Sequence, residues 1–236
     1  MSEPSVQPPA GGAAAFFDVD GTLLSSNIVH YYAYFRRRRM SRPVAAVWHG
    51  LFALKCLYFL LLDRVDRSRL NVVFYRGYRG MRVADLEAIM PECHRDVIVP
   101  RLYPAAADCV AGHVRAGRRV VLVTGSIDFI MAPLAKDLGA AHVLAPGLVR
   151  AGEVFTGDLS GPPLAEGEKA RRMQRLAEAE GIDLAGSYAY GDSIADLAML
   201  EAVGHPQAVN PDSRLAALSA SRGWPVHRWT LGPRAT

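Results

Sequence analysis

Hydrophobic positions follow two different patterns along the chain. After residue 100, short apolar runs that end in turn residues alternate with stretches of helical periodicity. The pattern predicts strands at 118–126, 141–146, 187–193, 206–210 and 225–229, a hairpin at 147–160, and helices at 127–138, about 166–180, 194–203 and 212–222. Strands that alternate with helices indicate a parallel sheet covered by helices on both faces.

The earlier part of the chain contains one further apolar run and then changes character. Residues 13–24 resemble the later strands, whereas residues 25–100 show long helical patterns and no convincing strand. We therefore expect an α/β core made of 13–24 and 101–230, with 25–100 inserted as an all-helical cap. Residues 1–12 are rich in Pro and Gly and lack the features of a signal peptide, so a disordered tail is expected there.

One segment of the expected cap, residues 44–62, is long and apolar enough to raise the question of a membrane span. His49 and Lys55 argue against a span. A single crossing would also place Asp18 and Thr124 on opposite sides of the bilayer, although both are expected in one site. We expect a buried cap helix, with a helix that lies on a lipid surface as the alternative.

Composition narrows the classes of partner. The chain has 236 residues, of which 50% are hydrophobic and 21% charged, which suits one sizeable core and excludes a disordered chain. The net charge of +4 is concentrated in clusters such as the arginine run 36–39. It favours anionic small molecules, or peripheral membrane contact through 36–62, over nucleic acid, for which no motif is visible. Cys56, Cys93 and Cys109 are scattered, as expected for thiols of a cytoplasmic protein.

Reactive side chains stand directly after several predicted strands, and parallel sheets bind their ligands at this end of the strands. Asp18 and Asp20 follow the first strand, Thr124 the next, and Asp192 a third. The carboxyl ends of parallel strands share one edge of a sheet, and Lys169, at the start of a helix, can reach that edge. These groups suit phosphoryl transfer: Asp18 can form an aspartyl phosphate, and Asp20 can act as general acid and then as general base.

Mg²⁺ is the cofactor that such a site would take. It is a hard cation that prefers oxygen ligands, and Asp18, the backbone carbonyl of Asp20, and Asp192 would supply them. Thr124 and Lys169 would hold the phosphoryl oxygens, and the positive charges of Lys169 and the metal would offset repulsion among the carboxylates.

Four motifs carry a resemblance to a known family: DVDGT, VTG, the lysine of EGEKA, and GDSIAD. In this order they resemble the signature motifs of the haloacid dehalogenase superfamily. The inserted helices are similar to the cap of its subfamily IB, the phosphoserine-phosphatase-like branch. The resemblance extends from about Ala14 to Trp229 and implies a Rossmann-like core with Mg²⁺-dependent phosphatase activity. It also implies that Gly125 helps to hold the phosphate and that Asp196 supports the lysine and the metal shell.

The resemblance restricts the type of reaction more than the identity of the substrate. The second acid, Asp20, favours hydrolysis of a phosphate ester, and transfer to another acceptor stays open. Ala195 stands where related enzymes often have asparagine. Phosphoserine-specific relatives carry a cap glutamate where this chain has Asn27, which weakens phosphoserine as the substrate. Arg76 resembles their cap arginine, with Arg79 as a competitor.

Other interpretations remain open beside this one. The apolar cap helix suggests a lysophospholipid-like substrate at a membrane surface, and a non-catalytic binding protein on the same fold is the contrasting hypothesis. Thr124 and Asp192 could each cap a helix. Cys109 and Arg115 have the spacing of a cysteine phosphatase, but they lie inside one predicted helix and we expect coincidence.

Overall fold

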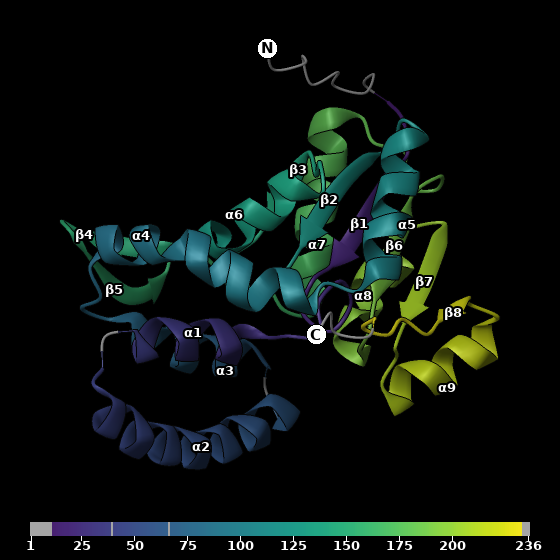
Figure 1. Ribbon diagram of the computed structural model, residues 1–236. Coiled ribbons are helices and arrows are strands. Elements are labelled where there is room, and N and C mark those ends of the chain that lie inside the picture. Colours follow the sequence, from purple (N-terminus) through teal and green to yellow (C-terminus); the bar gives the residue numbers. More distant parts are fainter. Residues whose placement is uncertain (1–10, 39, 66, 233–236) are drawn as a thin grey trace.

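A six-stranded parallel sheet forms the centre of the molecule (Figure 1). The computed structural model describes residues 11–38, 40–65 and 67–232. The strand order is β3–β2–β1–β6–β7–β8, with β1 Ala14–Asp18, β2 Arg119–Val123, β3 His142–Leu144, β6 Tyr188–Gly191, β7 His205–Val209 and β8 Val226–His227. The expected α/β fold with a parallel sheet is confirmed, and β1 lies inside the sheet between β2 and β6.

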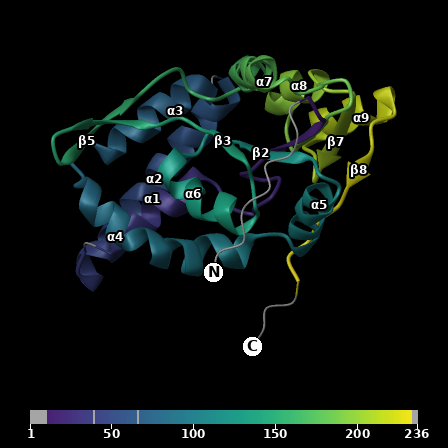
Figure 2. The same cartoon turned by 90° about the horizontal axis from the view of Figure 1, so that it is seen from above.

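Helices cover both faces of this sheet (Figure 2). The side chains of β1 alternate between two apolar clusters: Phe17 packs in the cluster that contains α5 and α6, and Phe16 in the one that contains α7, α8 and α9. The bounds are α5 Pro104–Arg115, α6 Asp128–Asp137, α7 Gly167–Glu180, α8 Leu197–Glu201, preceded by the turn η4 Ile194–Asp196, and α9 Ser213–Arg222. Because both faces are covered, β1 is buried along its whole length.

The segment between β1 and α5 is helical in the described residues, as expected. It contains α1 Ile28–Arg37, α2 Arg42–Val65, α3 Arg67–Tyr75, η1 Arg76–Tyr78, α4 Val83–Cys93, η2 His94–Ile98 and η3 Val99–Arg101. In Figure 1, α2 is the outermost helix of this group, on the far side of α1 and α3 from the sheet. The division into a core and a cap at residues 25–100 stays a prediction.

A hairpin that follows β3 joins this helical group. The strands β4 Leu148–Ala151 and β5 Val154–Leu159 form a separate two-stranded sheet. Its backbone pairs with the residues that lead into α4: Gly80 N–H donates to Phe155 O, Phe155 N–H to Met81 O, and the N–H of Val83, the first residue of α4, to Glu153 O, each at 2.9 Å. The hairpin itself was expected from the sequence, but its attachment to the helices was not.

The expectation that residues 44–62 form a buried helix is wrong for one side of α2. Val47, Leu51 and Leu54 are between 64% and 67% exposed. On the other side, the rings of Trp48 and Phe52 pack against Tyr32 of α1. The reason is the position of α2 at the edge of the group, where only one side meets another helix. Within the described ranges, no helix combines the length and apolarity needed to cross a membrane.

Candidate active site

The expected site residues meet at the carboxyl edge of the central strands. Asp18 is the last residue of β1, Thr124 directly follows β2, and Asp192 directly follows β6. The two neighbours of β1 are β2 and β6, and Asp18 lies opposite Val123 in the register. From β1 the strand order continues to β2 and β3 on one side and to β6, β7 and β8 on the other. Open α/β sheets bind ligands at such a switch point, outside the carboxyl ends of the strands.

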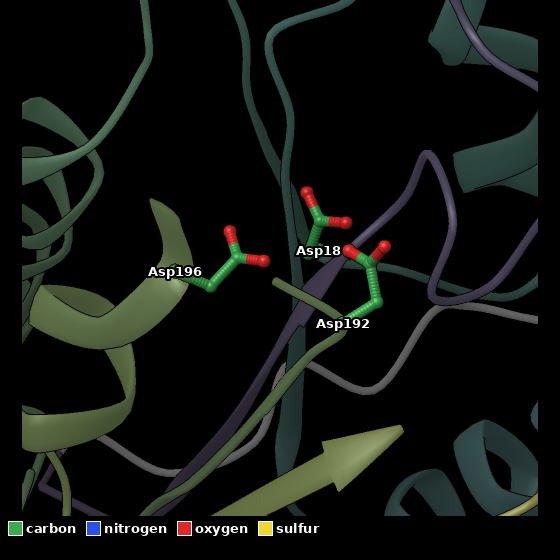
Figure 3. A group of neighbouring side chains, drawn as sticks. All are labelled: Asp18, Asp192 and Asp196. Carbon is green, nitrogen blue, oxygen red and sulfur yellow. The ribbon is translucent and has the colours of Figure 1, made fainter. Parts of the chain in front are cut away.

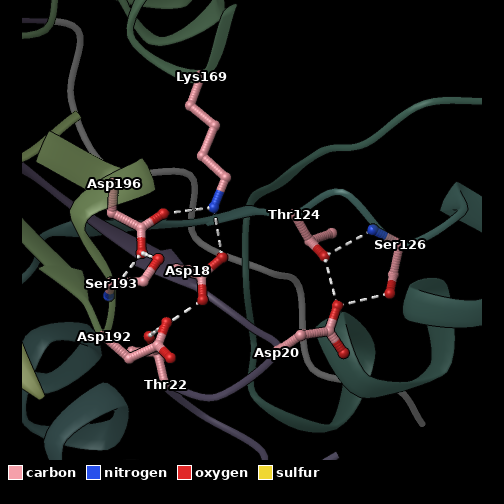
Figure 4. Close-up of polar contacts among 9 residues, drawn as sticks. All are labelled: Asp18, Asp20, Thr22, Thr124, Ser126, Lys169, Asp192, Ser193 and Asp196. Carbon is pink, nitrogen blue, oxygen red and sulfur yellow. Dashed lines mark hydrogen bonds and ion pairs between the residues drawn. The ribbon is translucent and has the colours of Figure 1, made fainter. Parts of the chain in front are cut away.

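Lys169 bridges two carboxylates at this edge (Figure 4). Its Nζ donates to Oδ1 of Asp18 at 2.5 Å and to Oδ1 of Asp196 at 2.6 Å, and all three side chains are buried. Burial alone would lower the pKa of Lys169, but the charges of Asp18 and Asp196 raise it above its usual value. Lys169 therefore stays a cation in the interior.

Opposing effects determine the pKa of the Asp18 carboxyl group. Burial raises its pKa to about 6, although the charge of Lys169 acts in the opposite direction. The nearby negative charge of Asp196 adds to the rise. Thr22 Oγ1 donates to the other oxygen, Oδ2, at 3.0 Å. One oxygen of Asp18 is thus oriented by the distant Lys169 and the other by the nearby Thr22.

Asp20 faces a different set of groups. Its Oδ2 accepts hydrogen bonds from Ser126 Oγ at 2.5 Å and Thr124 Oγ1 at 3.2 Å, and its Oδ1 accepts one from Tyr31 OH at 2.9 Å. Burial raises the pKa of Asp20, and these hydrogen bonds oppose the rise. Sequence reasoning missed Tyr31 and Ser126. Ser126 stands two residues after Thr124 at the same strand end, so its position was a usable signal.

The loop after β2 places Thr124 and Gly125 against two elements. Thr124 Oγ1 also accepts a hydrogen bond from the backbone N–H of Ser126 at 2.9 Å. The carbonyl of Gly125 accepts one from Tyr75 OH, at the end of α3, at 2.7 Å. Thr124 therefore orders its own loop and touches Asp20 as well. The alternative that Thr124 caps the next helix is wrong, because the N-cap residue of α6 is Ile127 and no side chain caps that helix.

Three carboxylates converge on one point (Figure 3). One oxygen each from Asp18, Asp192 and Asp196 lies within 4.8 Å of the others. Ser193 donates to Asp196 Oδ2 through its N–H at 3.2 Å and its Oγ at 3.1 Å. Such an all-oxygen set, anchored at a strand end, fits a hard divalent cation. The expected pair Asp18 and Asp192 is present, and Asp196 joins them although it was expected only in support.

A cavity of about 550 Å³ opens in front of these groups. Asp18, Asp20, Lys169 and Asp192 line one part of it. The inserted helices supply a largely apolar part, lined by Ile28, Val29, Cys56, Phe59, Leu70 and Phe74. Charged groups and apolar surface thus share one cavity, an arrangement typical of ligand sites.

The two expected cap residues have different outcomes. Asn27 lines the cavity, and its Oδ1 also caps α1 by accepting a hydrogen bond from Val29 N–H at 3.1 Å. Arg76 is exposed and does not line the cavity. It packs against the hairpin instead: a Cβ added at Gly157 would lie 3.0 Å from Arg76 Cα. The cap role expected of Arg76 therefore has no support in the geometry.

Another residue of the same segment reaches the cavity. Asn71 of α3 is 6% exposed and lines the cavity wall. A Cβ added at Gly125 would lie 3.3 Å from Asn71 Nδ2, so the amide faces the loop after β2. Sequence reasoning missed Asn71, because a helical pattern does not tell which turn of α3 faces the sheet.

The profile of the haloacid dehalogenase-like hydrolase family matches residues 15–201, most of the chain. The chain belongs to this family. The resemblance read from the four motifs is thereby confirmed.

Relatives of this hydrolase point to phosphatases. A probable phosphatase of Mycobacterium tuberculosis (strain ATCC 25618 / H37Rv) is 38% identical over 224 residues, covering 92% of this chain and 76% of the relative. Phosphoserine phosphatase SerB1 of the same strain is 32% identical over 240 residues, covering 97% and 75%. A solved structure from Bordetella pertussis Tohama I, of unknown function, has a TM-score of 0.78 at 30% identity, covering 91% and 97%. The expectation of a phosphatase enzyme is confirmed, and the chain is a phosphoserine-phosphatase-like member of its family.

Proposed function

We propose that this hydrolase acts on small phosphate monoesters through an aspartyl phosphate formed on Asp18, with Mg²⁺ as cofactor. The observation that carries the proposal is the ammonium of Lys169, held against the carboxylates of Asp18 and Asp196 in the wall of the cavity. A fixed cation beside the attacking carboxylate attracts the negatively charged phosphoryl group and favours a productive orientation.

The reaction has two steps with opposite proton transfers. In the first, an oxygen of Asp18 forms a bond to phosphorus while the P–O bond of the ester breaks, and Asp20 gives its proton to the leaving oxygen. In the second, Asp20 takes a proton from water. The water oxygen bonds to phosphorus, the bond to Asp18 breaks, and inorganic phosphate leaves.

The remaining groups bind and orient the phosphoryl group. Thr124 and Gly125 stand at the end of β2, next to Asp20, where a hydroxyl and backbone N–H groups can bind phosphoryl oxygens. Asp18, the backbone carbonyl of Asp20, and Asp192 would hold Mg²⁺, and the nearby carboxylate of Asp196 supports the fit. When bound, the ion supplies positive charge that offsets the carboxylates and stabilises the transferring phosphoryl group.

A second substrate class, an amphipathic phosphomonoester, is favoured by the apolar part of the cavity. Phe59, Leu70 and Phe74 face the same space as Lys169. A phosphate ester with an acyl chain could place its phosphate at Asp18 and its chain along these side chains. Relatives named for phosphoserine or histidinol phosphate argue for a small polar substrate instead.

The test is phosphate release from a panel of phosphomonoesters with Mg²⁺, run in parallel on Asp18→Asn. The panel contains an aryl phosphate, phosphoserine, histidinol phosphate, and the pair glycerol 3-phosphate and lysophosphatidate, which differ by one acyl chain. We expect turnover that stops with EDTA and is absent in Asp18→Asn. Equal activity of the variant would refute Asp18 as the nucleophile. A higher kcat/KM for lysophosphatidate than for glycerol 3-phosphate would select the amphipathic class, and the reverse order would reject it.

A further inference from the structure

The outer side of α2 presents an unusual amount of apolar surface. Of the twelve large hydrophobic side chains found exposed in the described part of the chain, six belong to this helix: Val44, Val47, Leu51, Leu54, Leu57 and Tyr58. Each is between 53% and 67% exposed. Five of them, at 44, 47, 51, 54 and 58, follow the three-and-four spacing that places residues on one side of a helix. We name these six residues the α2 stripe.

The inner side of α2 is occupied by the protein itself. Phe52 packs against Tyr32, with ring centroids 5.6 Å apart, and Phe59 packs against Phe74 at 5.4 Å. The helix is therefore apolar on two sides, and the rest of the protein covers only one of them. An exposed, contiguous apolar surface of this kind is typical of a site that binds another molecule or a lipid surface.

The charge around the stripe selects among the candidates for its partner. Residues 28–62 contain five arginines and one lysine and no Asp or Glu. Arg37, Arg42 and Lys55 are exposed, and Arg38 is engaged with Glu92 of α4. A second copy of the chain, packed stripe to stripe, would bring two such cationic segments together without an acidic group of either segment to pair with them. An anionic surface has the complementary charge.

We infer that the α2 stripe docks this protein on the surface of an anionic lipid bilayer. The apolar side chains would enter the boundary between headgroups and acyl chains, with the helix parallel to the surface, while Arg37, Arg42 and Lys55 attract anionic headgroups. This goes beyond the proposed function and does not rest on it. It gives the lipid-surface helix considered for residues 44–62 a defined docking face, since that face is exposed in the folded chain.

The docking face and the cavity share one helix. Cys56 and Phe59 of α2 line the cavity, whereas Leu54 and Tyr58, their near neighbours in the sequence, belong to the stripe. A phosphomonoester that lies in the bilayer surface would therefore meet the enzyme at the helix that borders its cavity.

The experiment is co-sedimentation of the full chain with vesicles of phosphatidylcholine and phosphatidylglycerol in equal parts, compared with pure phosphatidylcholine. We expect binding to the anionic vesicles that weakens with salt. The double variant Leu51→Glu/Leu54→Glu should lose affinity about tenfold or more and keep wild-type hydrolysis of a small aryl phosphate. The matched control Val114→Glu/Val226→Glu changes two exposed hydrophobic residues on α5 and β8 and should bind like the wild type.

Three results would overturn the inference. One is a wild-type chain that ignores anionic vesicles, and another is an equal loss of binding in the two double variants. The third is a wild-type dimer that Leu51→Glu/Leu54→Glu converts to a monomer without any vesicle binding, since a second copy would then cover the stripe. Asp18→Asn separates this inference from the proposed function: it should lose hydrolysis and keep vesicle binding.

Discussion

Lys169 Nζ lies 2.5 Å from Oδ1 of Asp18, and the two residues are 151 positions apart in the chain. Neither group could be buried alone at low cost, because a charge removed from water needs a partner of opposite sign. Asp196, 2.6 Å from the same ammonium, makes this a group of two carboxylates around one cation. The lysine therefore both permits the burial of Asp18 and places a positive charge at the proposed phosphoryl site.

Replacing this lysine should abolish most of the activity. In Lys169→Met the unbranched side chain becomes one atom shorter and loses its charge, so a bound phosphoryl group loses a fixed cation. We expect kcat for an aryl phosphate to fall by about 10²–10³-fold. The control is Lys136→Met, which removes an exposed lysine on α6 and should leave kcat unchanged. Wild-type kcat in Lys169→Met would contradict the role given to this residue.

A buried histidine next to β1 should make stability depend on pH. His113 of α5 has its Nε2 2.8 Å from Tyr190 OH, its ring packs edge-on against Phe17, and Arg118 Nη1 lies 3.5 Å from Nδ1. Burial, reinforced by the charge of Arg118, lowers the pKa of His113 to about 4. The unfolded chain, with the ordinary value near 6.5, then binds the proton more readily than the folded chain.

The stability that His113 contributes is therefore complete above pH 6.5 and is lost as the pH falls towards 4. The measurement is the free energy of unfolding by urea across this range, in the wild type and in His113→Gln. We expect the difference between them to change by about 2 kcal/mol, because glutamine does not titrate. His205→Gln, an exposed histidine, should keep the wild-type profile. Parallel profiles in wild type and His113→Gln would show that His113 does not cause the dependence.

The strand ends were predictable from the sequence, and the orientation of the inserted helices was not. Asp18, Thr124 and Asp192 each follow an apolar run, and parallel strands bring their carboxyl ends together whatever the loops do. In α2, by contrast, the inner residues Trp48 and Phe52 and the outer residues of the stripe are equally apolar. Periodicity cannot tell which of two apolar sides is buried, since tertiary packing decides it.

The same limit explains why the sequence indicated Arg76 as a site residue, whereas Asn71 lines the cavity in the structure. The two residues are five positions apart, and only the packing of α3 against the loop after β2 makes Asn71 face the cavity. We expect Asn71→Ala to lower kcat/KM about tenfold on the preferred substrate, through loss of one hydrogen bond to the bound ligand. Arg76→Ala should leave kcat/KM unchanged. A larger loss of kcat/KM in Arg76→Ala than in Asn71→Ala would show that the arginine, and not the asparagine, belongs to the site.

The turn after Asp20 should tolerate no side chain at Gly21. This glycine has φ +98°, and a Cβ added there would lie 2.3 Å from Oδ2 of Asp192, so alanine must displace the carboxylate expected to bind the metal. In Gly21→Ala we expect Mg²⁺ affinity, measured by titrating activity with the ion, to fall about 10–100-fold. Gly80→Ala is the matched control: its φ of +76° imposes a similar backbone strain, but nothing lies within 4 Å of the added Cβ. If both variants were less stable but bound Mg²⁺ as tightly as the wild type, Asp192 would not be a ligand that this turn holds in place.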